Sequence, residues 1–188
     1  MKTKLYLSTL FVLLSFTACS DIPQQKYEVS KDKVQLNVAF ADQKWDGATV
    51  PKDEVCSDHN PKGGHSPALT IDNLPTQTNY ILLSFSDETF KGMRNGGHGT
   101  IGYEVAAGIS KLTIPSVKGE TFALPDKFTT VREHQGAQFG KQEGAYLPPC
   151  SGGSNNLYTL EVKAIQKPNE AKGTYILLGD ANISLGRY

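Results

Sequence analysis

Glycine and proline interrupt this chain so often that they leave little room for long helices. The sequence holds 18 glycines and 10 prolines in 188 residues, at short intervals through most of its length. Both residues disfavour helix interiors, and no long segment sustains an apolar period of 3.6 residues. The best helical candidate, KFTTVREHQGAQ at 127–138, is itself interrupted by Gly136. We therefore expect a β-rich chain with at most a short helix.

Five segments have the apolar pattern of β-strands. They are VQLNVAF (34–40), NYILLSFS (79–86), TIGYEVA (100–106), LYTLEVKAI (157–165) and TYILLGDANISL (174–185). The fourth segment alternates with a period of two, so Tyr158, Leu160, Val162 and Ala164 are predicted to face a core. The second is apolar on both faces for most of its length, which indicates a central, fully covered strand. Together the segments predict an antiparallel β-sandwich with long loops.

The first 18 residues have the plan of a secretory signal peptide. Lys2 and Lys4 precede an apolar run that ends in small residues and is shorter than the roughly 20 residues that span a bilayer. Cys19 stands where cleavage would expose it, and SFTAC resembles a bacterial lipobox with phenylalanine where leucine is commoner. We expect a signal peptide at 1–18, lipidation of Cys19, a tether at 19–33 and a domain at 34–188. The alternative is a secreted protein cleaved elsewhere.

The expected location in the cell envelope and the even number of remaining cysteines together predict a disulfide. If Cys19 carries lipid, Cys56 and Cys150 remain in an envelope that favours disulfides, so we expect them to pair. Free thiols and metal ligation are the alternatives, because two histidines and an aspartate follow Cys56 closely. Their spacing fits no standard zinc pattern, and we predict no metal and no cofactor.

The charge balance gives no reason to expect nucleic acid as a partner. Removal of residues 1–18 takes away two lysines and no acids, which leaves 17 basic and 19 acidic side chains and a formal charge of −2. A strongly basic surface, the usual requirement for binding a phosphate backbone, is therefore not expected.

Polar residues gather where two of the predicted strands begin or end. Ser86 and Asp87 end one strand, and His98 follows a glycine pair in front of the next. An acid and an imidazole at neighbouring strand ends can pair, which fixes the tautomer of the ring. These residues and Ser151 contain the atoms for a hydrolytic site. The Gly-x-Ser-x-Gly elbow is missing from the sequence, so a hydrolase remains the alternative and a non-enzyme is predicted.

Taken in order, these features resemble the phosphatidylethanolamine-binding protein (PEBP) family, which includes the bacterial Raf kinase inhibitor-like proteins. The cues are GATVP (47–51), Cys56, HSPAL (65–69), SFSD (84–87), GGHG (96–99), PSVKGETFALP (115–125) and YLPPC (146–150) before the strand with Tyr158. The resemblance covers about 34–188 and implies a PEBP-like antiparallel sandwich. It also implies a small pocket for an anion such as phosphate or a phospholipid headgroup.

The family builds that pocket from an Asp-Pro-Asp-x-Pro segment, a histidine, a Gly-Pro-x-Pro-Pro loop and a His-Arg-Tyr segment. The matching positions here are Asp87, His98, Pro148, Pro149, Asn156 and Tyr158. Asn156 replaces the family's second histidine. Because asparagine donates hydrogen bonds without positive charge, we expect a weaker or altered anion preference, for example for a less charged or zwitterionic ligand. HSPAL, GGHG and YLPPCSGGSNN would form the pocket walls.

The predicted function is a lipid-anchored binding protein of PEBP type. It would belong to the bacterial cell envelope, and Ser20 after the lipidated cysteine fits sorting to the outer membrane, facing the periplasm. The alternative is an inhibitor or docking partner of an envelope protease or another enzyme, since some PEBP relatives dock on enzymes. Segment 127–147 would then supply the contact.

Overall fold

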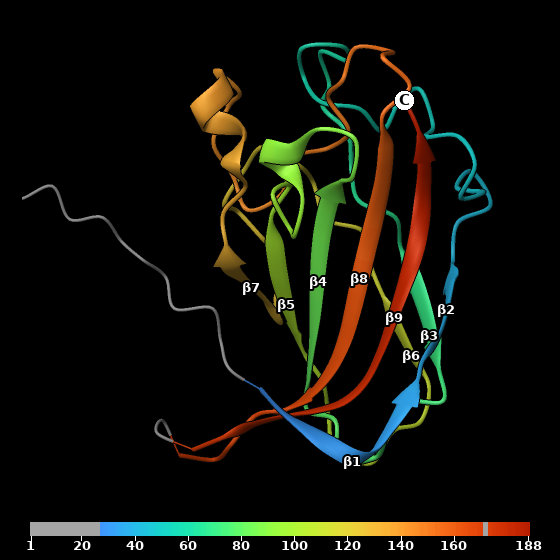
Figure 1. Cartoon of the computed structure of the whole chain (residues 1–188), viewed down its shortest axis with the longest axis vertical. Helices are drawn as coiled ribbons and strands as arrows, with labels where there is room; N and C mark the ends of the chain where they lie inside the picture. Colours follow the sequence, from blue (N-terminus) through green and yellow to red (C-terminus); the bar gives the residue numbers. More distant parts are fainter. Residues whose placement is uncertain (1–26, 171–172) are drawn as a thin grey trace, which may run out of the picture.

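A computed structural model describes residues 27–170 and 173–188 as two β-sheets that pack face to face (Figure 1). The strands are β1 (Tyr27–Gln35), β2 (Asn37–Phe40), β3 (Leu69–Asp72), β4 (Tyr80–Asp87), β5 (Thr100–Glu104), β6 (Leu112–Ile114), β7 (Phe128–Arg132), β8 (Leu157–Gln166) and β9 (Tyr175–Arg187). The large sheet has the order β1-β9-β8-β4-β5-β7, and the small sheet has the order β2-β3-β6. The predicted all-β sandwich with long loops is therefore confirmed.

The main core lies between the two sheets. Strand β8 has a strictly alternating burial pattern over most of its length, and Tyr158, Leu160, Val162 and Ala164 are all buried, as predicted. Strand β4 lies in the middle of the large sheet and is buried at seven of its eight positions. A smaller cluster around Tyr80, Leu82, Ile165 and Leu177 covers part of the opposite face of the large sheet. This second cluster explains why β4 is apolar on both faces.

The predicted strand at 34–40 is two strands in different sheets. β1 ends at Gln35 in the large sheet, β2 begins at Asn37 in the small sheet, and the buried Leu36 lies between them. The chain also enters the fold earlier than predicted, because residues 27–33 belong to β1 rather than to a tether. β1 pairs with β9 in parallel, whereas the other strand pairs among the described residues are antiparallel. The sandwich is thus antiparallel, as predicted, except for this one pair at the edge of the large sheet.

The helical candidate at 127–138 is wrong for most of its length. Its first part is the edge strand β7, where Phe128 packs against Tyr103 with ring centroids 4.7 Å apart. Only the segment after it is helical, as the 3-10 helix η2 (Gln135–Phe139), which ends at Gly140 with a left-handed backbone. Two threonines and a valine within β7 favour a strand, and pairing with β5 decides the outcome. The other short helix, η1 (Lys91–Met93), follows β4.

The predicted signal peptide, Cys19 and the first part of the tether lie outside the described residues. Within 27–170 and 173–188, no helix has the length and apolar character needed to cross a membrane.

Candidate functional site

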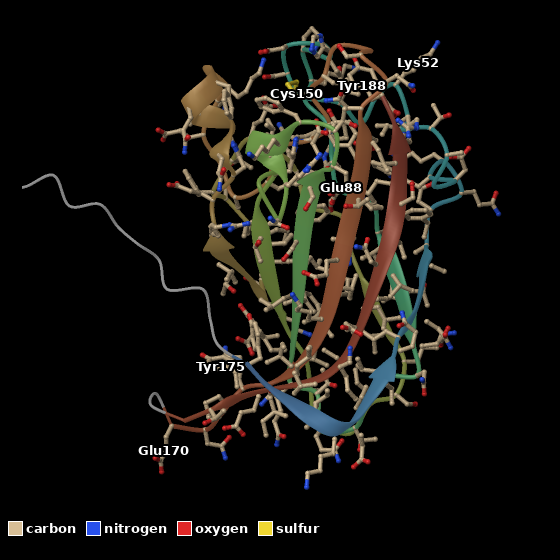
Figure 2. The ribbon with its side chains drawn as sticks, in the orientation of Figure 1. Lys52, Glu88, Cys150, Glu170, Tyr175 and Tyr188 are labelled. Atoms are coloured by element: carbon tan, nitrogen blue, oxygen red, sulfur yellow. A yellow bond between two sulfur atoms is a disulfide. The ribbon has the colours of Figure 1, made fainter. Side chains whose placement is uncertain are left out.

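The residues predicted for the pocket meet at one end of the large sheet. Asp87 ends β4 and is paired with Tyr158 near the start of β8, while His98 lies two residues before β5. Because β4 is antiparallel to both neighbours, its end meets their beginnings. Cys150 and Tyr188 lie at this same end, far from Tyr175 and Glu170 at the other (Figure 2). Segments remote in sequence are thus brought together by strand pairing.

Asp87 holds the loop that follows β4. Its Oδ1 accepts hydrogen bonds from the backbone N–H groups of Thr89 at 2.8 Å and Phe90 at 2.9 Å. Its Oδ2 accepts a hydrogen bond from the side-chain amide of Asn156 at 2.6 Å. The side chain is buried, with 3% of the residue exposed. The loop therefore keeps a tight turn although it lacks the proline and second aspartate of the family segment.

His98 is held in one tautomer by a backbone carbonyl. Its Nδ1 lies 2.8 Å from the carbonyl oxygen of Leu147, which can only accept, so Nδ1 carries the proton and Nε2 is an acceptor in the neutral ring. Burial disfavours the charged ring and lowers the pKa of His98 to about 4. The edge of the ring meets Tyr158, with centroids 5.2 Å apart. Burial also raises the pKa of Tyr158 to about 12.

The YLPPC loop is attached to the site by a disulfide and by backbone hydrogen bonds. Cys56 and Cys150 form the predicted disulfide, with Cα atoms 5.2 Å apart. The backbone N–H of Cys56 donates to Pro149, and that of Cys150 donates to the Tyr158 hydroxyl at 3.1 Å. The sulfurs of the two cysteines and a ring nitrogen of His59 lie within 4.8 Å of one another. Because both sulfurs are in the disulfide, they are not thiolate ligands for a metal.

These parts surround a cavity of about 110 Å³, which we call the His98 cavity. Four of the six predicted ligand-binding residues line it, namely Asp87, His98, Asn156 and Tyr158. Pro148 and Pro149 are buried but are not among the lining residues, so their contribution is to shape the loop. Ser151 and Cys150 of the same loop do line the cavity.

Several lining residues were not predicted from the sequence. They are Phe90 after β4, Met93 of η1, Gly136 and Phe139 of η2, and Lys141 after it. Phe90 and Phe139 meet edge to face with centroids 5.1 Å apart, although 45% and 47% of these residues are exposed. The sequence signal for these two residues is a phenylalanine within a polar loop, but their positions in the sequence do not reveal that they meet.

The HSPAL segment, which the resemblance places at the pocket, lies elsewhere. His65 and Ser66 line a separate groove of about 610 Å³ together with Lys44 and Glu54. Glu54 is buried there and accepts hydrogen bonds from the Lys44 ammonium and the His65 backbone N–H. This ion-paired carboxylate belongs to the other groove and not to the His98 cavity.

The two serines considered for a hydrolytic site are engaged in structural hydrogen bonds. The Ser86 hydroxyl accepts from the backbone N–H of Gly96 at 2.8 Å, and the Ser151 hydroxyl donates to the carbonyl of Tyr188 at 2.6 Å. Among the described residues, neither hydroxyl is hydrogen-bonded to His98.

Comparisons with known proteins identify the fold. No protein-family model and no curated protein matches the sequence. Among solved structures, YbcL from E. coli, described as a new member of the mammalian PEBP family, aligns with a TM-score of 0.52 and 18% identity, over 82% of this chain and 98% of YbcL. CT736 from Chlamydia trachomatis, described as a PEBP homologue, aligns with a TM-score of 0.49 and 17% identity, over 82% and 97% of the two chains. The YbcL alignment and the two-sheet architecture confirm the resemblance at the level of the fold: the chain is a PEBP-fold protein.

Proposed function

We propose that the protein is a binding protein that holds one end of a small headgroup-like ligand in the His98 cavity. The observation that carries this proposal is the convergence of Asp87, His98, Asn156 and Tyr158 on one cavity from three separate segments of the chain. Polar groups that meet in a largely apolar cavity are typical of a ligand site.

The size of the cavity limits what can enter it. Its volume of about 110 Å³ is well below the roughly 300 to 1,000 Å³ of pockets that enclose drug-sized ligands. The bound group is therefore a small end of a molecule, such as a phosphate-like group or a phospholipid headgroup, with the rest of the ligand outside.

The proposal includes the location inferred from the leader sequence. A chain with a lipidated Cys19 would present this domain in the bacterial envelope, anchored to the outer membrane and facing the periplasm. The Cys56–Cys150 disulfide supports an oxidising compartment, because disulfides persist there. Metabolic labelling with a fatty acid, in the chain and in Cys19→Ala, tests the anchor: label should be incorporated only with Cys19 present.

Binding without turnover is part of the proposal. Serine catalysis needs a hydroxyl hydrogen-bonded to a base, and the Ser86 and Ser151 hydroxyls contact backbone groups instead. Turnover of ester or phosphate substrates that disappeared in His98→Ala would contradict it.

The test is thermal unfolding with phosphate, phosphoethanolamine or glycerophosphate. A ligand at about 100 times its Kd adds about 2.7 kcal/mol to the free energy of unfolding, which raises Tm by roughly 5 to 10 °C for a domain of this size. The readout is the ligand-induced shift, so a lower starting Tm in a variant does not affect the comparison.

Variants locate the site. His98→Ala should abolish the shift, whereas His65→Ala should keep it, because His65 lines the other groove. Asn156→His should change the ranking of the ligands, since it adds a group that can be protonated. A shift that survives in His98→Ala would place the ligand outside this cavity and overturn the proposal.

The docking function remains the second candidate, and one observation favours it. Phe139 lies within the segment 127–147 considered for docking and is 47% exposed. Aromatic residues in exposed loops can anchor a partner protein. Inhibition of a purified envelope protease by the protein, lost in Phe139→Ser, would support this function over ligand binding.

A further inference from the structure

We propose that Cys56, Cys150 and His59 form a zinc site when the disulfide between the two cysteines is reduced. Zinc would then replace the disulfide as the link between two loops. The inference is carried by three donor atoms that the fold brings together and by the turn that connects two of them. It goes beyond the proposed function and does not depend on which ligand the His98 cavity binds.

The three donors lie close together although they come from two loops. The sulfurs of Cys56 and Cys150 and a ring nitrogen of His59 are all within 4.8 Å of one another. Two donors on one tetrahedral zinc ion are roughly 3.5 to 3.8 Å apart, because its bonds are about 2.3 Å to sulfur and about 2.0 Å to nitrogen. Breaking the S–S bond lets the sulfurs separate to this distance, and the exposed His59 ring can turn to follow them. The site therefore requires side-chain movements of only about 1 to 2 Å.

A tight turn sets the spacing between two of the donors. The backbone N–H groups of His59 and Asn60 both donate to the carbonyl of Cys56, at 3.0 and 2.9 Å. Two residues separate Cys56 from His59 within this turn, as in the Cys-x2-Cys pairs of structural zinc sites. The third donor, Cys150, is 94 residues away from Cys56 in sequence, so the spacing around Cys56 does not reveal the group.

The loop that carries the third donor is attached to this turn by contacts that do not involve sulfur. The backbone N–H of Cys56 donates to the carbonyl of Pro149 at 3.0 Å. The His59 ring lies against the same loop, because a Cβ at Gly152 would be 3.1 Å from the Cε1 atom of the ring. The ring also packs against Tyr188 at this end of the molecule (Figure 2), with centroids 5.9 Å apart. These contacts keep the donors near one another after reduction.

The donor set suits zinc. Two thiolates and one imidazole are the protein ligands of some catalytic zinc sites, and soft thiolates disfavour magnesium and calcium. The described residues add no fourth histidine, cysteine or carboxylate to this group, so water would occupy the fourth position. The neighbouring Asp58 is ion-paired with Lys141.

Reduction comes first, and a dithiol reductant supplies the two electrons. Its thiolate attacks the sulfur of Cys150, which is partly exposed and lines the His98 cavity, whereas Cys56 is fully buried. The S–S bond breaks, a mixed disulfide forms at Cys150, and the Cys56 sulfur leaves with the electron pair and takes up the proton that the attacking thiol lost. The second thiol of the reductant then displaces Cys150, gives up its proton to it and closes the reductant's own disulfide. Binding of Zn²⁺ releases the two thiol protons of the protein.

The first experiment measures zinc binding to the untagged full chain by competition with a chromogenic chelator. Cys19 is changed to serine in every sample, so that Cys56 and Cys150 are the remaining cysteines. Protein reduced with a phosphine and desalted without oxygen should bind one Zn²⁺, and Co²⁺ in its place should give the absorption of thiolate-to-metal charge transfer. The disulfide form should bind neither ion. Equal zinc binding by the two forms, or binding of Cu(I) without Zn²⁺, would overturn the inference.

Two exposed histidines provide a matched pair of variants. His59→Ala removes a direct ligand and should weaken zinc binding by at least about tenfold, since loss of even an outer-shell partner costs about 10-fold to 100-fold in affinity. His65→Ala makes the same change at an exposed histidine that lines the other groove, and it should leave Kd unchanged. His59→Cys supplies a third donor again and should recover tight binding with stronger charge-transfer absorption. Equal zinc affinities in His59→Ala and His65→Ala would contradict the site.

Thermal unfolding shows whether zinc binds the folded chain. Zn²⁺ at about 100 times its Kd should raise the Tm of the reduced protein by roughly 5 to 10 °C and leave the Tm of the disulfide form unchanged. Zinc that lowered the Tm of the reduced protein would be bound by unfolded thiols, and a reduced chain that stayed unfolded with zinc would have no such site; either result overturns the inference.

Failure of this inference can be told from failure of the proposed function. The zinc experiments contain no headgroup ligand, and the headgroup experiments use the disulfide form without metal. A headgroup shift that depends on His98, without zinc binding by the reduced chain, would leave the proposed function intact and remove the zinc site.

Discussion

His98 illustrates how one backbone carbonyl sets the chemistry of a side chain. Donation from Nδ1 to Leu147 fixes the tautomer, and burial keeps the ring neutral at physiological pH. A neutral ring offers Nε2 as an acceptor, whereas a charged ring would offer a donor. The protonation state of this residue therefore decides which ligand group the cavity can accept.

The lowered pKa of His98 makes a prediction about stability. Its pKa is about 4 in the folded state and about 6.5 when unfolded, so between these values the unfolded chain binds a proton that the folded chain does not. Stability from this residue is present above pH 6.5 and is lost as the pH falls toward 4. The loss is on the order of 3 kcal/mol over this window.

Urea unfolding between pH 7 and 4.5 checks this prediction. Carboxyl groups also titrate near the lower limit, so the control is His98→Asn, whose amide can still donate to Leu147 but does not titrate. The wild-type chain should lose on the order of 2 to 3 kcal/mol more than the variant. An NMR titration in which His98 ionises near pH 6.5 would show that its environment is different.

At the scale of elements, the turn between β4 and β5 depends on the close approach of two backbones. Gly99 has a φ of +109°, and a Cβ there would lie 2.1 Å from the carbonyl oxygen of Ala145. The same approach lets Leu147 donate its N–H to the carbonyl of His98. A side chain at residue 99 would push the YLPPC loop away from the strand.

Gly99→Ala should therefore lower the free energy of unfolding by at least about 2 kcal/mol. The matched control is Gly140→Ala, because Gly140 also has a positive φ of +78° but a Cβ there meets nothing within 4 Å. The control should cost only the backbone strain, about 1 kcal/mol. Urea unfolding of both variants measures the difference, and equal losses would show that the backbone contact is unimportant.

The elements that could be predicted are those with a clear pattern of their own. β8 alternates and β4 is apolar on both faces, so their positions and burial followed from the sequence. β3 and β6 have four and three residues, too few for a pattern to emerge. The predicted helix at 127–138 is wrong for β7, because edge pairing with β5, a long-range contact, overrides local preference.

At the scale of the whole molecule, one disulfide joins two distant loops. Cys56 and Cys150 are 94 residues apart in sequence, and closing a loop of that length removes much freedom from the unfolded chain. Reduction of the disulfide should lower the free energy of unfolding by up to about 4 to 5 kcal/mol.

Urea unfolding with and without a phosphine reductant measures this effect. The double change Cys56→Ala with Cys150→Ala should show a comparable loss and no further response to the reductant. A loss below about 1 kcal/mol on reduction would mean that strand pairing alone holds these loops together.

The sequence by itself predicted that the chain is β-rich, which strands are buried and that two cysteines pair. Its resemblance to the PEBP family placed six residues at one site, and four of them line the His98 cavity. These conclusions depend on the local periodicity of apolar residues, on the even number of cysteines that remain after Cys19 and on the order of the motifs. All three can be read along the chain. Only the tertiary structure decided that 34–40 divides between two sheets and that Phe90, Phe139 and Lys141 complete the cavity. Those residues lie in segments that come together only because distant strands pair. Local sequence patterns do not predict which distant strands pair.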